Sequence, residues 1–218
     1  KRDNLTIAFD REEIMRKGND LLSLDTQALR EKYGLPADGR DWNIEWARED
    51  LARLDSITKS TKQVWYRPFD TRWTIYTDKS KGFLAYPRWG SMKCMLNENL
   101  ALVAMRQVFQ DIEFYSHFGV TRNLIDERTF YSNRGGTYLF PLFSSSAGDG
   151  SAGLFGDKEP NSNLSGSFMR AIRLSITTEG SASNEKNHDL NPEIVFRYIY
   201  ATLWSPYYRS RYKESLKI

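Results

Sequence analysis

Cysteine, histidine and long apolar runs are scarce in this sequence. Its 218 residues include one cysteine, Cys94, and two histidines, His117 and His188. A single cysteine excludes an internal disulfide, which fits a reducing compartment, so we expect a cytoplasmic protein. One cysteine and two distant histidines give no clustered ligands, so we expect no bound metal. No run of about 18 apolar residues occurs, and the sequence therefore predicts no membrane-spanning helix.

Several catalytic patterns are also missing. Glycine is never followed by lysine, which excludes a Walker-type phosphate loop. Neither Asp-x-Lys nor Glu-x-Lys occurs, which removes the usual pattern of metal-dependent nucleases. Asn191-Pro192-Glu193 lacks the aromatic residue with which adenine methyltransferases stack on a flipped base, and a helix N-cap explains it. We therefore expect neither a catalytic residue nor a cofactor in this chain.

Basic and aromatic residues are present, and they are unevenly distributed. Residues 64–143 carry 10 basic and 7 acidic side chains, and residues 191–218 carry 5 and 2, whereas residues 1–63 carry 12 and 13. Residues 64–143 also hold 17 of the 30 aromatic residues. Basic charge interleaved with aromatic rings is typical of a nucleic-acid surface. An aromatic core with a solvated basic rim is the alternative interpretation.

The first 63 residues have helical patterns. Asp10 is a candidate N-cap for a helix in FDREEIMRKGNDLLSLD. Gly34 and Pro36 end a second helix in TQALREKY, and DWNIEWAREDLARLD repeats its apolar residues at helical spacing. We expect residues 1–63 to form a helical spacer or connector.

The middle of the chain has strand patterns. VWYRPFDTRWTIYT is rich in β-formers on both sides of Pro68, and NLALVAMRQ (99–107) is a short apolar run. IEFYSHFGVTR (112–122) is a further candidate strand. TFYSNRGGTYLFPLF (129–143) predicts two strands joined at Asn133–Gly136.

The last third alternates polar linkers with helices. Residues 144–163 are small, polar and glycine-rich, which predicts a flexible loop, and SGSFMRAIRLSI then favours a helix. Asn191 and Ser205 are N-caps, each followed by proline at the first helical position. The sequence thus predicts an α+β fold with a helical N-terminal spacer, a central mixed or antiparallel β-sheet region and C-terminal helices. We expect the second domain to span residues 64–218.

The densest aromatic and basic stretch is VWYRPFDTRW (64–73). Arginines and an aspartate in one short turn can pair internally, and alternating aromatic residues can pack in a core. We expect a structural role, in which three side chains orient the turn after Pro68: Arg67, Asp70 and Arg72. The aromatic residues expected in the core are Trp65, Phe69 and Trp73.

Three blocks of sequence, in this order, carry a family resemblance. They are YRPFDTRWTIYTDKSKGFLAYPRW (66–89), FGVTRNLIDERTFYSNRGGTYLFPLF (118–143) and PEIVFRYIYATLWSPYYRSRYKESLKI (192–218). Together they resemble the C-terminal specificity region of Type ISP restriction–modification enzymes. These single-chain enzymes also carry a nuclease, an ATP-dependent helicase-like motor and an N6-adenine methyltransferase.

The resemblance implies that this chain recognises a short sequence in double-stranded DNA. It also implies that the methyltransferase and motor domains lie upstream in the same polypeptide, together with their S-adenosylmethionine, ATP and magnesium. The chain begins KRDNLTIAFD without a methionine or a signal peptide, so we expect a fragment of a longer protein.

Basic and amide side chains outside the regular strands are the candidates for contact with DNA. Arginine and lysine bind phosphates or read guanine, while asparagine and glutamine pair with adenine. The candidate DNA-binding residues are Lys79, Lys81, Arg88, Arg106, Gln107, Arg122, Asn123, Arg128, Asn133 and Arg134.

Two other classes of function remain open from the residues alone. An aromatic-rich module that binds carbohydrate or protein would also use six tryptophans and twelve tyrosines. An enzyme with an unfamiliar site is the third hypothesis. A steep fall of affinity with salt distinguishes DNA binding from sugar stacking.

Overall fold

The computed structural model describes residues 2–106, 108, 115–131, 135–144, 161–179 and 190–217. The chain divides into two compact units. The N-terminal unit comprises Lys1–Leu96 and Asn123–Tyr131, and the C-terminal unit comprises Asn97–Arg122 and Ser132–Ile218. This division differs from the expected boundary between residues 63 and 64, because the first strand runs across that boundary and packs with the helices before it.

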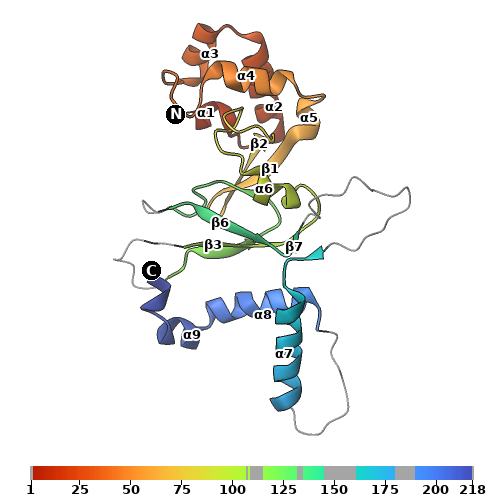
Figure 1. Ribbon diagram of the computed structural model, residues 1–218. Helices are drawn as coiled ribbons and strands as arrows, with labels where there is room; N and C mark the ends of the chain where they lie inside the picture. Colours follow the sequence, from red (N-terminus) through yellow and green to blue (C-terminus); the bar gives the residue numbers. More distant parts are fainter. Residues whose placement is uncertain are drawn as a thin grey trace, which may run out of the picture. The chain divides into compact units, whose positions relative to one another are not determined.

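Five helices build most of the N-terminal unit (Figure 1). Each of the longer ones begins at a side chain that accepts a backbone N–H: Asp10 Oδ1 accepts from Glu13 at 2.7 Å, as the sequence predicts. Gly34 ends the third helix with φ 59°, a left-handed conformation that glycine adopts without strain. The helices are α1 (Asp3–Thr6), α2 (Arg11–Ser23), α3 (Thr26–Tyr33), α4 (Ile44–Ala52) and α5 (Ile57–Ser60).

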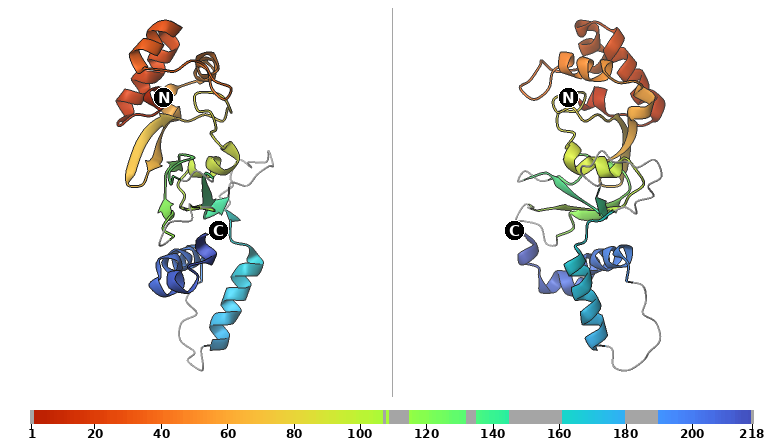
Figure 2. Two further views of the ribbon diagram at one scale, coloured as in Figure 1. Left: turned by 90° about the vertical axis from the view of Figure 1, so that its left-hand side faces the viewer. Right: turned by 45° about the vertical axis from the view of Figure 1, so that its right-hand side comes forward.

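A small sheet completes this unit. β1 (Thr61–Arg67) pairs antiparallel with β2 (Asp70–Ile75) and parallel with β5 (Leu124–Ile125), in the order β2-β1-β5. Figure 2 shows the β1–β2 hairpin as a long twisted ribbon extending from the helices of the same unit. Helix α6 (Trp89–Met92) and the 3-10 helix η1 (Lys93–Met95) follow.

The core of the N-terminal unit joins the helices to the hairpin. Its fully buried side chains include Leu5, Ile14, Leu51, Ile75 and Phe83. Burial of each such side chain contributes about 1.5–3 kcal/mol. The helices and the hairpin therefore form one structural body, which explains why the expected spacer is not separate from the strands that follow it.

The C-terminal unit has its own antiparallel sheet. β3 (Ala101–Met105) lies between β4 (Phe118–Thr121) and β6 (Thr137–Pro141). On β3 the residues Ala101, Val103 and Met105 are buried and the residues between them are half-buried, which is the alternation expected of a strand with one covered face. Two short strands, β7 (Phe143–Ser144) and β8 (Asn161–Ser162), pair with each other.

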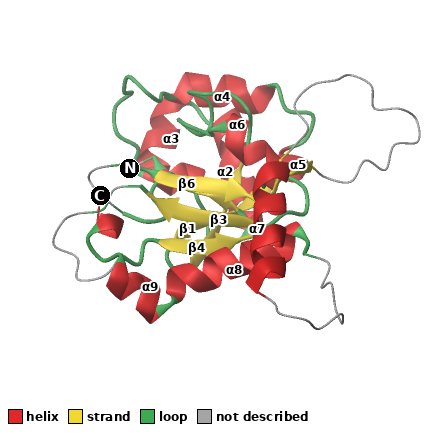
Figure 3. Cartoon of the chain, turned by 60° about the horizontal axis from the view of Figure 1, so that its bottom comes forward, coloured by secondary structure: helices red, strands yellow, loops and turns green. Residues whose placement is uncertain are grey.

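Helices of the C-terminal unit supply aromatic contacts to this sheet. The ring centroid of Phe118 on β4 lies 4.8 Å from that of Trp204. The Phe118 ring also meets the Tyr200 ring edge-on, with the centroids 6.5 Å apart. Figure 3 shows α8 running along the β4 side of the sheet. The helices are α7 (Gly166–Glu179), α8 (Pro192–Trp204), α9 (Pro206–Arg211) and the 3-10 helix η2 (Ser215–Lys217).

The α+β class and the predicted N-caps of α8 and α9, Asn191 and Ser205, are confirmed. The expected strand at the start of residues 129–143 is wrong. Thr129 instead lies in a turn, because its hydroxyl donates to the Trp65 carbonyl at 2.6 Å and its N–H donates to the Asp126 carbonyl. Of the predicted loop at 144–163, residues 145–160 lie outside the described residues, while residues 161–162 form β8.

The predicted strand at 112–122 is shorter than expected. Only Phe118–Thr121 forms β4, and residues 112–114 lie outside the described residues. Within the described part of the chain, no helix combines the length and the apolar character that a bilayer crossing requires.

Candidate nucleic-acid interface

The β1–β2 hairpin is held by arginines on both strands. Arg72 Nε lies 2.5 Å from Asp70 Oδ1, and the Arg72 guanidinium stacks on the Phe9 ring at 3.3 Å. The hydrogen bond to Asp70 raises the pKa of Arg72 further. Arg67 pairs with Asp126 at 2.7 Å, not with Asp70 as expected. The expected trio is thus divided between two ion pairs, one within the hairpin and one to the segment after β5.

The aromatic residues of the hairpin do not share one environment. Trp65 is partly buried and meets Phe130 edge-on at 5.4 Å, and Trp73 packs partly against the core. The expectation that Phe69 lies in the core is wrong, because this side chain is fully exposed at the turn. Its φ of 62° takes the residue out of the strand conformation, so the alternation of faces along a strand does not apply to it.

Tyr66 connects the hairpin to α1. Its hydroxyl donates to Asp3 Oδ2 at 2.8 Å, and the Arg67 guanidinium lies 3.8 Å from its ring centroid. Burial, followed by the hydrogen bond to Asp3, raises the pKa of Tyr66 to about 12. The phenol therefore stays protonated and remains a donor at neutral pH.

The segment after β2 is anchored by one buried carboxylate, Asp50 of α4. Its Oδ2 accepts from the Thr77 hydroxyl at 2.6 Å and from the Phe83 N–H at 2.8 Å, while Oδ1 accepts from Arg53 at 2.9 Å. Gly82 passes so close that an added Cβ would lie 2.1 Å from Asp50 Oδ2. Backbone and side chain therefore fix the course of this segment tightly.

Two candidate lysines lie on the anchored segment. Lys79 Nζ is 3.3 Å from Glu49 Oε2, and Lys81 Nζ lies 5.5 Å from the Trp46 ring centroid. Lys81 is exposed and has φ 58°, and its N–H donates to the Ala85 carbonyl at 2.9 Å. Both ammonium groups are placed along one side of α4.

Arg88 is a candidate with a different environment. Most of its side chain is buried, and burial lowers the pKa of its guanidinium, against the opposing effect of the carboxylates of Glu127 and Asp126. The neighbouring rings of Tyr76 and Trp89 stack at 6.1 Å, and the Tyr76 hydroxyl donates to the Pro87 carbonyl at 2.7 Å. This environment favours a positioning role for Arg88.

The segment around β5 presents two more candidates in the N-terminal unit. Asn123 is half-buried just before β5, and Arg128 is exposed just after it. Asp126 Oδ1 accepts from the Arg128 N–H at 2.9 Å, and the Arg128 guanidinium lies 6.0 Å from the Tyr131 ring. Asp126 therefore stabilises this turn and also pairs with Arg67.

The remaining described candidates belong to the C-terminal unit. Arg106 is exposed directly after β3, and Arg122 is exposed directly after β4. Arg122 Nη1 lies 3.7 Å from Oε1 of the exposed Glu98. β3 and β4 run antiparallel, so the two arginines follow strands at opposite ends of the sheet. Three candidates lie outside the described residues: Gln107, Asn133 and Arg134.

The C-terminal segment carries further cations, which are not among the sequence-predicted candidates. Arg211 is exposed, with Nη1 3.1 Å from the Tyr207 hydroxyl, and the Arg209 guanidinium lies 5.4 Å from the Trp204 ring. The signal was a run of three basic residues among tyrosines in PYYRSRYK. Such a segment also suits phosphate contact.

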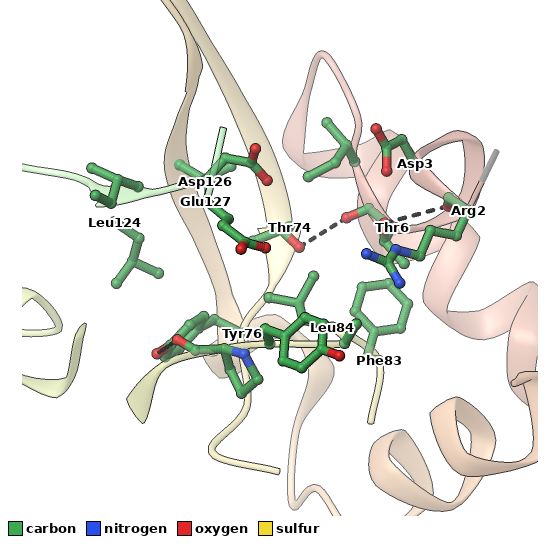
Figure 4. Close-up of a pocket in the computed structure, with 16 residues that line it drawn as sticks. Arg2, Asp3, Thr6, Thr74, Tyr76, Phe83, Leu84, Leu124, Asp126 and Glu127 are labelled. Carbon is green, nitrogen blue, oxygen red and sulfur yellow. Dashed lines mark hydrogen bonds between the residues drawn. The ribbon is translucent and has the colours of Figure 1, made fainter. Parts of the chain in front are cut away.

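A small cavity lies inside the N-terminal unit (Figure 4). Its volume is about 80 Å³, well below the roughly 300–1,000 Å³ typical of small-molecule sites. Figure 4 shows the carboxylates of Asp126 and Glu127 on one side of it and the rings of Tyr76 and Phe83 on the other. Among its charged lining residues, Asp3, Asp126 and Glu127 outnumber Arg2, which disfavours phosphate. The candidate interface is therefore a surface and not this cavity.

The model of the Type ISP C-terminal specificity domain matches residues 1–218. The chain therefore belongs to the family of Type ISP C-terminal specificity domains. No curated protein gave a significant match.

Solved structures share the fold. A cryo-EM structure of a DrdV–DNA complex is similar with a TM-score of 0.62 and 17% identity, covering 99% of this chain and 19% of that chain. The ATP-dependent Type ISP restriction–modification enzyme LlaBIII bound to DNA gives a TM-score of 0.54 and 18% identity, covering 99% of this chain and 13% of that one. This chain thus spans less than a fifth of the chains it resembles.

Proposed function

We propose that this chain recognises a short sequence in duplex DNA as the specificity domain of a restriction–modification enzyme. The observation that carries the proposal is the match of the specificity-domain model to all of residues 1–218. Support comes from two solved structures of the same fold, both of which are complexes with DNA. In the complete polypeptide, this domain would direct an N6-adenine methyltransferase and an ATP-dependent nuclease to their site.

The exposed cations supply the part of binding that does not depend on sequence. Arg106 and Arg122 of the C-terminal unit and Lys81 and Arg128 of the N-terminal unit place their charges in solvent. Each contact of such a charge with a phosphate releases counterions, which makes affinity fall with salt. These four side chains are the proposed phosphate contacts.

Asn123 is the proposed base-reading residue among the described candidates. A neutral amide gains little from a phosphate, but it pairs bidentately with adenine in the major groove. The side chain is half-buried directly before β5, whose first residue, Leu124, pairs with Val64 of β1. Such a rigid attachment suits a group that must discriminate between bases.

The chain is proposed to act without chemistry of its own. Methyl transfer requires S-adenosylmethionine, and cleavage and translocation require magnesium and ATP; the proposal places all three in the other domains of the polypeptide. Incubation of the 218-residue chain with labelled S-adenosylmethionine and plasmid should therefore transfer no label. Transfer of label to the plasmid would contradict this part of the proposal.

Selection from a randomised duplex library tests DNA recognition directly. The chain should enrich one asymmetric sequence, and the affinity for the selected duplex should fall steeply between 50 and 200 mM salt, by about 0.9 logarithmic units per phosphate contact for each tenfold rise in salt. A carbohydrate- or protein-binding module would enrich no duplex. Failure to enrich any sequence would overturn the proposal.

A further inference from the structure

The turn between β1 and β2 presents one large aromatic residue to solvent. Phe69 has a relative exposure of 106%, the highest among the exposed large hydrophobic residues of the described chain. Its φ of 62° lies in the left-handed region, which glycine and asparagine adopt at much lower cost. Neither burial nor turn geometry therefore explains a phenylalanine at this position.

The strands beneath Phe69 are braced on both sides. On β2, Arg72 pairs with Asp70 at 2.5 Å and stacks on Phe9 at 3.3 Å. On β1, Arg67 pairs with Asp126 at 2.7 Å. Both strands are held next to the turn, so the backbone that carries the ring is rigid. Binding through this ring should therefore cost little conformational entropy.

The surroundings of Phe69 distinguish between possible occupants. The residues that follow it, Asp70 and Thr71, are polar, so the strand after the turn does not extend the apolar surface of the ring. Residues 61–75 carry three basic side chains and one acidic side chain. Arg67 and Arg72 are paired with Asp126 and Asp70, so little net charge of either sign lies beside the ring. A single apolar ring on a rigid turn fits insertion between the base pairs of a duplex.

We propose that Phe69 inserts between adjacent base pairs of the duplex that this domain binds. The inference rests on the proposed function and adds a specific contact to it. Insertion removes the ring from water and stacks it on a base, which contributes binding energy for any base because every base has a π-face. It also unstacks one step of the duplex, which is the deformation that precedes base flipping.

Fluorescent bases in the selected duplex test the insertion. 2-Aminopurine replaces each adenine in turn, and pyrrolocytosine replaces each cytosine, so that every base pair is sampled. The unsubstituted chain should raise the fluorescence at one step. Phe69→Ala should lose that rise and bind the duplex roughly 5- to 150-fold more weakly, as expected for one stacking contact. Its salt dependence should be unchanged, because the ring contacts no phosphate.

Three variants serve as controls. Phe69→Trp keeps a ring and should keep the fluorescence rise, whereas Phe69→Gly suits a φ of 62° and should melt no lower than the parent but lose the rise. Tyr198→Ala removes another exposed ring, 70% accessible on α8, and should leave the fluorescence unchanged.

The possible results separate the two proposals. A duplex bound by Phe69→Ala with parental affinity and a parental fluorescence rise would overturn the insertion alone. Loss of the rise in Tyr198→Ala to the same extent would also overturn it, because the effect would not belong to Phe69. If the parent enriches no duplex, the insertion and the proposed function both fail.

Discussion

Charged side chains are used differently in the two units. Of the twelve ion pairs between described side chains, ten lie in the N-terminal unit. Lys32–Asp20 joins α3 to α2, and Lys79–Glu49 joins the segment after β2 to α4. Arg67–Asp126 joins β1 to the segment after β5. In the C-terminal unit, the exposed Arg122 faces only an exposed glutamate at 3.7 Å. Many cations of the first unit therefore maintain structure, while Arg106 and Arg122 of the second are exposed.

The comparison extends to the sheets. The hairpin of the N-terminal unit is braced by arginine–aromatic stacking and ion pairs, whereas the sheet of the C-terminal unit is covered by ring contacts from α8. Substitutions of the ion-paired arginines of the hairpin should thus change stability before binding, and substitutions of Arg106 and Arg122 in the second unit should do the reverse.

The largest effect is expected for Asp50→Ala. This carboxylate has no exposed surface and accepts from Thr77, Phe83 and Arg53. Its removal leaves a buried N–H and a hydroxyl without partners, so the free energy of unfolding should fall by about 3 kcal/mol. Urea denaturation measures this change. The adjacent and exposed Glu49→Ala is the control and should stay within about 0.5 kcal/mol of the parent.

Gly82→Ala tests the same anchor from the backbone side. The new methyl group would meet Asp50 Oδ2 at 2.1 Å, so the segment must move, at a cost of about 1–3 kcal/mol. Gly90→Ala is the matched control, because an added Cβ there meets nothing within 4 Å and α6 gains a better helix former. Equal melting temperatures for Gly82→Ala and Gly90→Ala would show that Asp50 does not fix the segment after β2.

Arg72→Ala and Arg122→Ala test the comparison between the units most sharply. Loss of the ion pair and of the stacking on Phe9 should reduce stability by about 1–2 kcal/mol in Arg72→Ala. Arg122→Ala should leave stability unchanged, weaken binding to all duplexes alike and reduce the salt slope by about one unit. Urea denaturation and binding titrations at two salt concentrations distinguish them. Reversed effects would refute the division of roles.

The smallest effect concerns pH. Burial raises the pKa of Asp20, but hydrogen bonds from Lys32 and Tyr33 outweigh it, so the pKa is lowered overall. A lowered pKa in the folded state stabilises the protein above the unfolded-state pKa, and this contribution is lost as pH falls through the folded-state pKa. Asp20→Asn should therefore reduce stability by about 1 kcal/mol at pH 7.

The pH dependence of that difference is the decisive feature. The gap between the parent and Asp20→Asn should close as the solution is acidified below about pH 4, where Asp20 takes up a proton in the unfolded chain. Urea denaturation at several pH values measures it, with the exposed Glu49→Gln as control. A gap that stays constant down to pH 2 would contradict the ion-pair explanation.

Local signals in the sequence predicted much of the fold. Asp10, Asn191 and Ser205 begin helices because a cap acts on N–H groups two or three residues away, and this range is visible in the sequence. The hairpin at Pro68 is equally local. The α+β class and the family resemblance followed from such patterns.

Long-range pairing was not predictable in the same way. Arg67 pairs with Asp126, 59 residues away, although Asp70 is much nearer in the sequence. β5 has two residues and carries no strand signal of its own, and Asp50 anchors Phe83 across 33 residues. Strand alternation places Phe69 in the core, but the turn at Phe69 breaks the alternation and exposes the ring. Such contacts depend on tertiary packing that no short window of sequence contains.

The most direct test of the central claim is a competition between two duplexes of the same length and composition, one carrying the selected sequence and one with that sequence scrambled. At physiological salt, the 218-residue chain should prefer the selected duplex by a factor of about 10³ or more, as specific DNA-binding proteins do. Equal affinity for the two duplexes would contradict the account, because binding would then come from phosphates alone.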